Sequence, residues 1–172
     1  IGQILSQQRF LPFDLGPLLR EIHRRLHLNL SFTDWIKSGE KENGRYFTDA
    51  LLAEEILREV SNPKNSEWRD VVVVGNRSVE GVLYIIETME PYRGQKNIIV
   101  WIESPLNLLY QRYLLRTQTC LPLSDFLRIL EDDDRLGLNE LRNAANARIQ
   151  NNSERKDLEL QINDLILRLG YL

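Results

Sequence analysis

Four consecutive valines at residues 71–74 constrain the fold of this chain more than any other segment. A strand with apolar side chains on both faces must be covered on both, which is typical of a parallel sheet between layers of helices. A second apolar run at residues 98–102 predicts another such strand, and helical patterns follow the two runs at residues 79–86 and 106–116. The alternation of strand and helix predicts an α/β fold.

Length and composition are those of one globular domain. The chain has 172 residues, of which 42% are hydrophobic and 27% charged, so we expect a single domain over residues 1–172. The formal net charge of −3 argues against general nucleic-acid binding but allows a local basic site. No apolar run approaches the roughly 20 residues of a membrane span. The single cysteine, Cys120, excludes an internal disulfide and favours a cytoplasmic location.

The rest of the chain is mainly helical in pattern. Gly16 and Pro17 open one helix, whereas residues 10–13 are short and contain a proline, so we expect an edge strand or a loop there. Composition alone predicts a helix over residues 141–147. Apolar residues at helical spacing from Ile1 onward indicate that the sequence begins partway through a helix. We therefore expect it to be a piece of a longer chain.

The turn after the valine strand is the first candidate binding site. Ligands of open parallel sheets bind beyond the carboxyl ends of the strands, where Gly75 and Arg77 follow the valines. A glycine allows the backbone to turn tightly, and an arginine can donate two hydrogen bonds to one phosphate. The alternative is a plain strand–helix turn with a surface arginine.

Two groups of arginines are further candidates. Arg112 and Arg116 are four residues apart on one predicted helix face, where their repulsion would be relieved by an anion. The alternative is a pair of cations favoured by the helix dipole. Arg20, Arg24 and Arg25 form a basic stripe on the helix that starts near Pro17, and its alternative interpretation is a solvated face.

We predict no metal site and find no classical catalytic motif. His23 and His27 have a spacing compatible with a metal, but no cysteine or carboxylate cluster accompanies them in the sequence. The acidic run at residues 132–134 is typical of a solvated segment. The sequence contains neither a Walker A motif, G-x-x-x-x-G-K-[ST], nor a dinucleotide-binding G-x-G-x-x-G motif.

Taken together, these segments resemble a P-loop nucleoside monophosphate kinase, in particular the branch that contains dephospho-coenzyme A kinase and archaeal adenylate-kinase-like proteins. Residues 15–20 are similar to a G-D-x-[LI]-R element of that family, with Arg20 at the arginine and Pro17 in place of the acid. Val74-Gly75-Asn76-Arg77 is similar to its D-G-x-R turn, with Val74 in place of the aspartate.

The resemblance extends over most of the remaining chain. Residues 105–116 are similar to the family's P-x-x-x-R-x-x-R-x-x-x-R helix, in which Arg112 and Arg116 match the later arginines and Leu109 replaces the first. Residues 147–151 are similar to its last strand, A-D-x-x-I-x-N. The segment 117–123 corresponds to the lid.

The resemblance implies a three-layer α/β/α sheet whose central first strand and Walker A loop lie outside this sequence; the alternative is a rearranged relative with three or four strands. That strand would lie between the strands at residues 71–74 and 98–102. Without it, the facing edges of the two strands would leave ladder hydrogen bonds unmade, at about 1–3 kcal/mol for each buried group.

The implied activity is phosphoryl transfer from ATP, with Mg²⁺ held chiefly by the nucleotide and the P-loop. In this interpretation Arg20, Gly75 and Arg77 bind the substrate phosphate, and Arg112 and Arg116 act in catalysis from the lid. The expected partners are a nucleotide or similar small molecule and the rest of a parent chain or a protein partner, and we expect no membrane.

Two alternatives remain open at this point. In the first, the kinase fold has lost catalysis and acts as a regulatory or scaffolding domain of a larger protein. In the second, the chain binds nucleic acid through its basic helix, which its acidic net charge disfavours.

Overall fold

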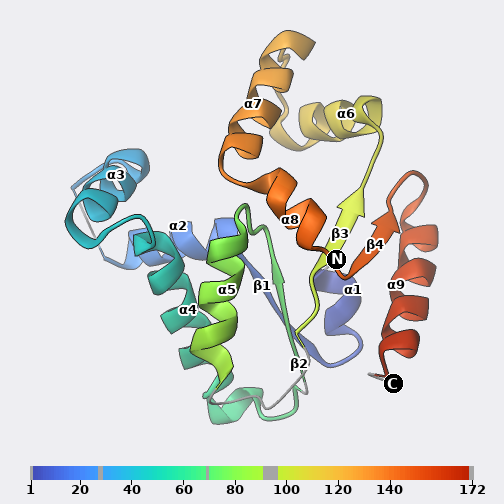
Figure 1. Cartoon of the computed structure of the whole chain (residues 1–172), viewed down its shortest axis with the longest axis horizontal. Coiled ribbons are helices and arrows are strands. Elements are labelled where there is room, and N and C mark those ends of the chain that lie inside the picture. The colour runs from blue at the N-terminus through green and yellow to red at the C-terminus, as the bar shows by residue number, and fades with distance from the viewer. Residues whose placement is uncertain (1, 27–28, 69, 91–96, 171–172) are drawn as a thin grey trace. The chain divides into compact units, whose positions relative to one another are not determined.

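The computed structural model describes residues 2–26, 29–68, 70–90 and 97–170 (Figure 1). Contacts group them into two compact units. The first unit comprises the described residues up to Asn76 and those from Glu80 to Glu90. The second unit comprises Arg77–Val79 and the described residues from Asn97 onward. Each unit is described by itself.

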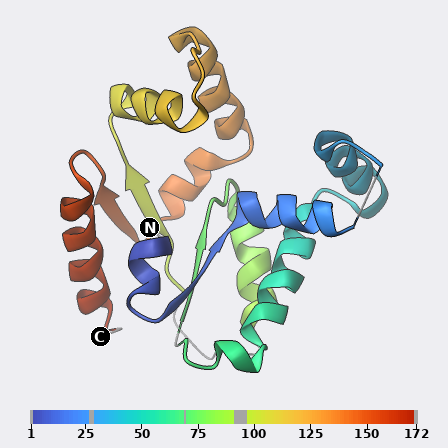
Figure 2. The ribbon, with the colours of Figure 1, turned by 180° about the vertical axis from the view of Figure 1, so that it is seen from behind.

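The first unit is built around a pair of parallel strands. Its elements in chain order are α1 (Gly2–Ser6), β1 (Phe10–Asp14), α2 (Leu15–Arg25), α3 (Phe32–Asn43), α4 (Phe47–Val60), the 3₁₀ turn η1 (Pro63–Asn65), β2 (Asp70–Val74) and α5 (Val79–Met89). β1 pairs with β2 in register, from Phe10 opposite Asp70 to Asp14 opposite Val74. Helix α1 leads into β1 and packs against this sheet (Figure 2).

The strand at β1 confirms the edge-strand interpretation of residues 10–13 and extends it to Asp14. Pro12 lacks a backbone N–H, and a proline is tolerated in a sheet where the strand has only one neighbour. β1 has such a position, because its only sheet partner in the described structure is β2. The proline is therefore compatible with the position of β1.

Helices α2 to α5 enclose the hydrophobic core of the first unit. Ala53 and Ile56 of α4 are fully buried at its centre. Around them lie Leu52 of the same helix and buried side chains of β1 and the other helices: Phe13, Leu15, Ile22, Trp35, Ile85 and Met89. The core thus holds the end of β1 and the start of α2 in place, which fixes the turn between them.

The valine strand β2 is less covered than its sequence predicts. All five of its residues, Asp70–Val74, are partly exposed in the described structure. A non-alternating apolar strand favours burial on both faces and pairing on both edges. β2 has one neighbour, β1, among the described strands. Among the described strands, none pairs with its second edge.

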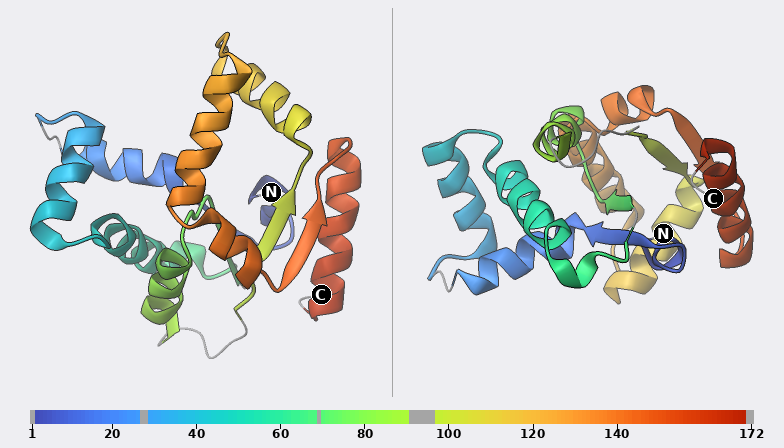
Figure 3. Two further views of the ribbon diagram at one scale, coloured as in Figure 1. Left: turned by 45° about the horizontal axis from the view of Figure 1, so that its top comes forward. Right: turned by 90° about the horizontal axis from the view of Figure 1, so that it is seen from below.

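The second unit also contains a pair of parallel strands. Its elements are β3 (Val100–Glu103), α6 (Leu106–Thr117), α7 (Leu123–Arg135), α8 (Leu138–Ala144), β4 (Ala147–Gln150) and α9 (Arg155–Leu169). β3 pairs with β4 from Val100 opposite Ala147 to Glu103 opposite Gln150. Helix α9 runs beside β4 (Figure 3) and buries Leu158, Ile162 and Ile166.

The strand that the family resemblance predicts near residue 147 is confirmed as β4. Composition predicts a helix over residues 141–147, but the observed helix α8 ends at Ala144. The prediction is therefore wrong for residues 145–147. The reason is tertiary, because Asn146 binds Ile99 through both backbone and side chain. Its Oδ1 accepts from the Ile99 N–H at 2.8 Å, and its own N–H donates to the Ile99 carbonyl at 2.8 Å.

The predicted α/β class with parallel strands is confirmed. The described strands form two separate two-stranded sheets, β1–β2 and β3–β4, rather than one continuous sheet. The loop after Thr117 separates α6 from α7, within the segment 117–123 expected to form a lid. Among the described helices, none combines the length and the apolar character needed to cross a membrane.

Candidate functional site

The carboxyl end of the β1–β2 sheet brings two turns together. β1 ends at Asp14 and α2 begins at the next residue, while β2 ends at Val74 and is followed by Gly75. The register places Asp14 opposite Val74, so the two turns are neighbours. Gly75 has φ +97°, a backbone conformation in which a side chain would be strained, which explains why a glycine follows the strand.

Asp14 lies at the centre of this cluster. A Cβ atom added at Gly75 would lie 3.7 Å from Asp14 Oδ1 and 3.9 Å from the Leu15 amide nitrogen. A Cβ added at Gly16 would lie 3.4 Å from Arg20 Nη1 and 3.8 Å from Asp14 Oδ1. Because Gly16 and Gly75 have no side chains, their backbone is not covered by a Cβ atom next to the Asp14 carboxylate, the Arg20 guanidinium and the first turn of α2. We call Asp14, Gly16, Arg20 and Gly75 the strand-end cluster.

The charge of Arg20 has no acidic partner in the described structure. Its guanidinium lies 5.7 Å from the centroid of the Phe32 ring, a cation–π contact that orients the side chain without neutralising it. The other arginines of the basic stripe differ, because Arg24 pairs with Glu21 and Arg25 pairs with Glu55. Of the three, Arg20 is therefore the one best placed to bind an anion.

Arg112 is held at the strand ends of the second unit. Its Nη1 donates to Ser104 Oγ at 3.0 Å and to the Asn151 carbonyl at 2.9 Å, and its Nη2 donates to the Ser153 carbonyl at 3.3 Å. Ser104 directly follows β3, and Asn151 directly follows β4. The guanidinium thus links the carboxyl ends of both strands.

The contacts of Arg112 leave part of its hydrogen-bonding capacity unused. All three acceptors are neutral oxygens, so within the described residues they balance none of its charge. A guanidinium has five N–H groups, and three hydrogen bonds leave two of them for another acceptor. Arg112 therefore combines a fixed position with a free positive charge.

The side chain of Arg116 makes different contacts from that of Arg112, although the two residues lie one turn apart on α6. Its guanidinium lies 5.8 Å from the centroid of the Tyr113 ring, and its side chain is exposed. Tyr113 in turn packs against the buried Phe126 of α7. In the described conformation Arg112 is therefore tied to the strand ends, and Arg116 lies on the aromatic contact between α6 and α7.

Arg77 is engaged by the acidic run. Its Nη1 lies 3.2 Å from Asp133 Oδ1 of α7, and the Asp133 side chain is 24% exposed. The interpretation of residues 132–134 as a solvated run is thus wrong for Asp133, which is partly buried. The sequence contained no signal for this pair, because the two residues are far apart along the chain.

A hollow of about 390 Å³ lies beside β3 in the second unit. Its lining includes the consecutive residues Trp101, Ile102, Glu103, Ser104 and Pro105, together with Leu109, Arg142 and Gln150. Hydrogen bonds from Gln150 and Arg142 lower the pKa of the Glu103 carboxyl below its usual value, with Arg148 adding a weaker attraction. Because Trp101–Pro105 all line the hollow, it lies along the end of β3 and the two residues that follow this strand.

The described residues contain no group of three or more histidine, cysteine, aspartate or glutamate side chains placed to hold a metal. His27, one of the two histidines with metal-compatible spacing, lies outside the described residues. The other, His23, packs against Trp35 and Phe32 and contacts the Leu30 carbonyl through Nε2.

Neither a protein-family model nor a curated protein matches this chain. The site therefore stands on its own geometry. Sequence reasoning selected Arg20 and Gly75, which the fold brings to one sheet end, but it missed Asp14. An acidic residue directly after an apolar run and directly before Gly-Pro was the signal that could have identified it.

Proposed function

We propose that this chain is a nucleotide-kinase-like module whose first unit recognises the phosphate of a nucleotide. The observation that carries the proposal is the strand-end cluster. It combines the unpaired guanidinium of Arg20, the open backbone of Gly16 and Gly75, and the first turn of the eleven-residue helix α2. Guanidinium groups and helix N-termini both favour phosphate oxygens.

Asp14 adds an acceptor to this cationic site. Its side chain makes no capping hydrogen bond to α2. The carboxylate can accept a hydrogen bond from a ribose hydroxyl or from water bound to the Mg²⁺ that accompanies a nucleotide. Inorganic phosphate has no ribose hydroxyl, so a hydrogen bond from that hydroxyl to Asp14 would distinguish a nucleotide from inorganic phosphate.

Phosphoryl transfer would further require a P-loop, which supplies the site for ATP and Mg²⁺. We propose that the free edges of β2 and β3 pair with a parallel strand carrying such a loop. The support is that β2 pairs with β1, β3 pairs with β4, and no ladder joins β2 to β3 among the described strands. The partial exposure of the valine strand also fits an absent neighbour.

In the catalytic form of the proposal, Arg112 and Arg116 act on the transferring phosphate. Arg112 suits this role because its position is fixed by neutral oxygens while two N–H groups stay available. Arg116 would have to leave the ring of Tyr113 to join it. Arg77 would assist only after release from Asp133.

The second candidate function is a kinase-fold module that binds a nucleotide or a protein partner without turnover. Two observations favour it. Arg77, predicted to bind the substrate phosphate, is paired with Asp133, and Arg112, predicted to act in catalysis, links two strand ends, so both have structural partners. In addition, Val74 stands where the resembled family has an aspartate. A nucleic-acid function gains no such support, because Arg24 and Arg25 are both paired with glutamates.

Calorimetry on the 172-residue chain tests the phosphate site. AMP, GMP, CMP and UMP are titrated singly, each beside its nucleoside. We expect at least one monophosphate to bind more tightly than its nucleoside, and we expect Arg20→Gln to lower that affinity at least tenfold. Arg24→Gln is the matched control, because this residue lies one turn along the same helix with a glutamate partner. Equal losses in the two variants, or no preference for the phosphate, would contradict the proposal.

A further inference from the structure

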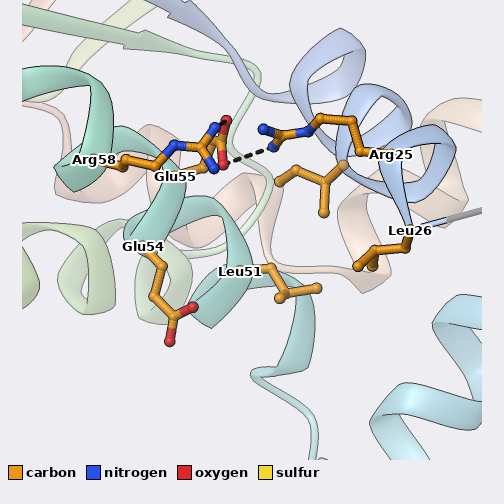
Figure 4. Close-up of a pocket in the computed structure, with 7 residues that line it drawn as sticks. Arg25, Leu26, Leu51, Glu54, Glu55 and Arg58 are labelled. Atoms are coloured by element: carbon orange, nitrogen blue, oxygen red, sulfur yellow. Dashed lines mark hydrogen bonds and ion pairs between the residues drawn. The ribbon is translucent and has the colours of Figure 1, made fainter. Parts of the chain in front are cut away.

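A groove between α2 and α4 lies in the first unit and takes no part in the strand-end cluster (Figure 4). Its volume is about 380 Å³. Its apolar lining is formed by Ile22 of α2, by Leu26 directly after that helix, and by Leu51 of α4. Leu26 is 50% exposed, so the groove presents an apolar surface to solvent.

The polar sides of this groove carry opposite charges. Arg25 lies 2.7 Å from Glu55, and Arg58 pairs with the other oxygen of the same carboxylate, which is only 11% exposed. Both guanidinium groups keep N–H donors that Glu55 does not use, although Arg58 also lies 3.9 Å from Glu59. Glu54 points away from this cluster (Figure 4), and no ion pair holds it in the described structure.

Helix α9 has a surface complementary to the groove. Leu160 and Leu167 are 60% and 59% exposed, and they lie two turns apart on the side opposite the buried face of α9. At 100° per residue, two aspartates flank the leucines on one side and a lysine flanks them on the other: Asp157, Asp164 and Lys156. Asp164 also forms an exposed pair with Arg168, a type of contact that contributes little and exchanges readily.

We infer that α9 of one copy of this chain binds in the α2–α4 groove of a second copy. The leucines then cover the apolar lining, the aspartates face Arg25 and Arg58, and Lys156 faces Glu54. This is recognition of an amphipathic helix in an apolar groove, with the charge pattern setting the direction of the helix. The surfaces are different on the two partners, so the contact is heterologous.

Sedimentation velocity on the full chain, from low micromolar to near-millimolar concentration, tests this contact. We expect weak, concentration-dependent association, as is usual for a small interface. The double variant Leu160→Gln, Leu167→Gln should weaken it at least tenfold. Leu115→Gln on α6 is the control, because this leucine is 79% exposed but lies outside both surfaces. Far-UV circular dichroism checks that each variant folds.

A charge exchange gives a second test that does not depend on leucine. Glu54→Lys and Lys156→Glu should each weaken association about threefold or more, and the double variant should recover most of the loss. A chain that stays monomeric over the whole range overturns the inference. Association that survives the α9 leucine variant, or a charge exchange without recovery, also overturns it.

Mixing two variants, one with a damaged α2–α4 groove and one with a damaged α9 surface, tests whether these two surfaces bind each other. A chain with Leu26→Gln has a damaged groove, and a chain with both α9 leucines replaced has a damaged helix. Each alone should associate weakly, whereas the mixture should form a complex between the intact groove of one chain and the intact helix of the other. A mixture that associates no better than its components overturns the inference.

Discussion

Replacing Gly39 by alanine tests the packing of the first unit most sharply. Gly39 is buried in α3, and a Cβ atom at this position would lie 2.1 Å, 2.3 Å and 2.5 Å from three atoms of the Phe47 ring. That ring packs edge-on against Trp35, with centroids 5.5 Å apart. It therefore has to shift against a core side chain to admit a methyl group.

Two opposing effects set the size of the change. Alanine is favoured over glycine inside a helix by about 1 kcal/mol. Overpacking a core costs about 1–3 kcal/mol. We therefore expect Gly39→Ala to lower the free energy of unfolding by about 1 kcal/mol. With a urea m-value of about 2 kcal/mol/M, the midpoint falls by about 0.5 M.

A double-mutant cycle separates the two effects. In a Phe47→Leu background the obstructing ring is gone, so the same alanine should stabilise the protein by up to about 1 kcal/mol. Urea unfolding followed by tryptophan fluorescence is suitable, because Trp35 lies beside the ring. Stabilisation by Gly39→Ala in both backgrounds would refute the described contact between α3 and Phe47.

Three further predictions concern charged groups. Burial raises the pKa of Asp49, and repulsion from Glu40 and Glu80 adds to the effect, so the free energy of unfolding falls as the pH rises through that pKa. Asp49→Asn should therefore raise the urea midpoint at neutral pH. The difference in midpoint between the variant and the wild type should disappear below about pH 4. Hydrogen bonds lower the pKa of Glu103, so its carboxylate stabilises the fold above the pKa it has in the unfolded chain, and this stabilisation is lost as the pH falls. The difference in urea midpoint between the wild type and Glu103→Gln should therefore shrink on acidification. Arg112→Gln removes three hydrogen bonds and should lower the free energy of unfolding by about 1–3 kcal/mol.

Strands and helices with a strong apolar pattern could be predicted from the sequence, but how deeply they are buried could not. The valine run became β2, although all five of its residues are partly exposed, and the helical pattern of residues 106–116 became α6. The end of α8 could not be predicted from composition. It depends on hydrogen bonds between Asn146 and Ile99, which are 47 residues apart.

The candidate site was predictable only in part. Gly75 follows a recognisable strand, so its place at the sheet end followed from periodicity. The cation–π contact of Arg20 with Phe32 and the pairing of Arg77 with Asp133 depend on tertiary placement. Helical spacing alone suggested that Arg112 and Arg116 act together, but each has its own contact in the described structure.

The most direct test of the central claim is to observe where a nucleotide binds. Backbone amide NMR spectra of the chain are recorded with the monophosphate that binds most tightly and with its nucleoside. The account predicts phosphate-dependent shifts at Leu15, Gly16 and Gly75, around the unpaired Arg20. Phosphate-dependent shifts that leave these amides unmoved, or no difference between nucleotide and nucleoside, would contradict a phosphate site at the carboxyl end of β1 and β2.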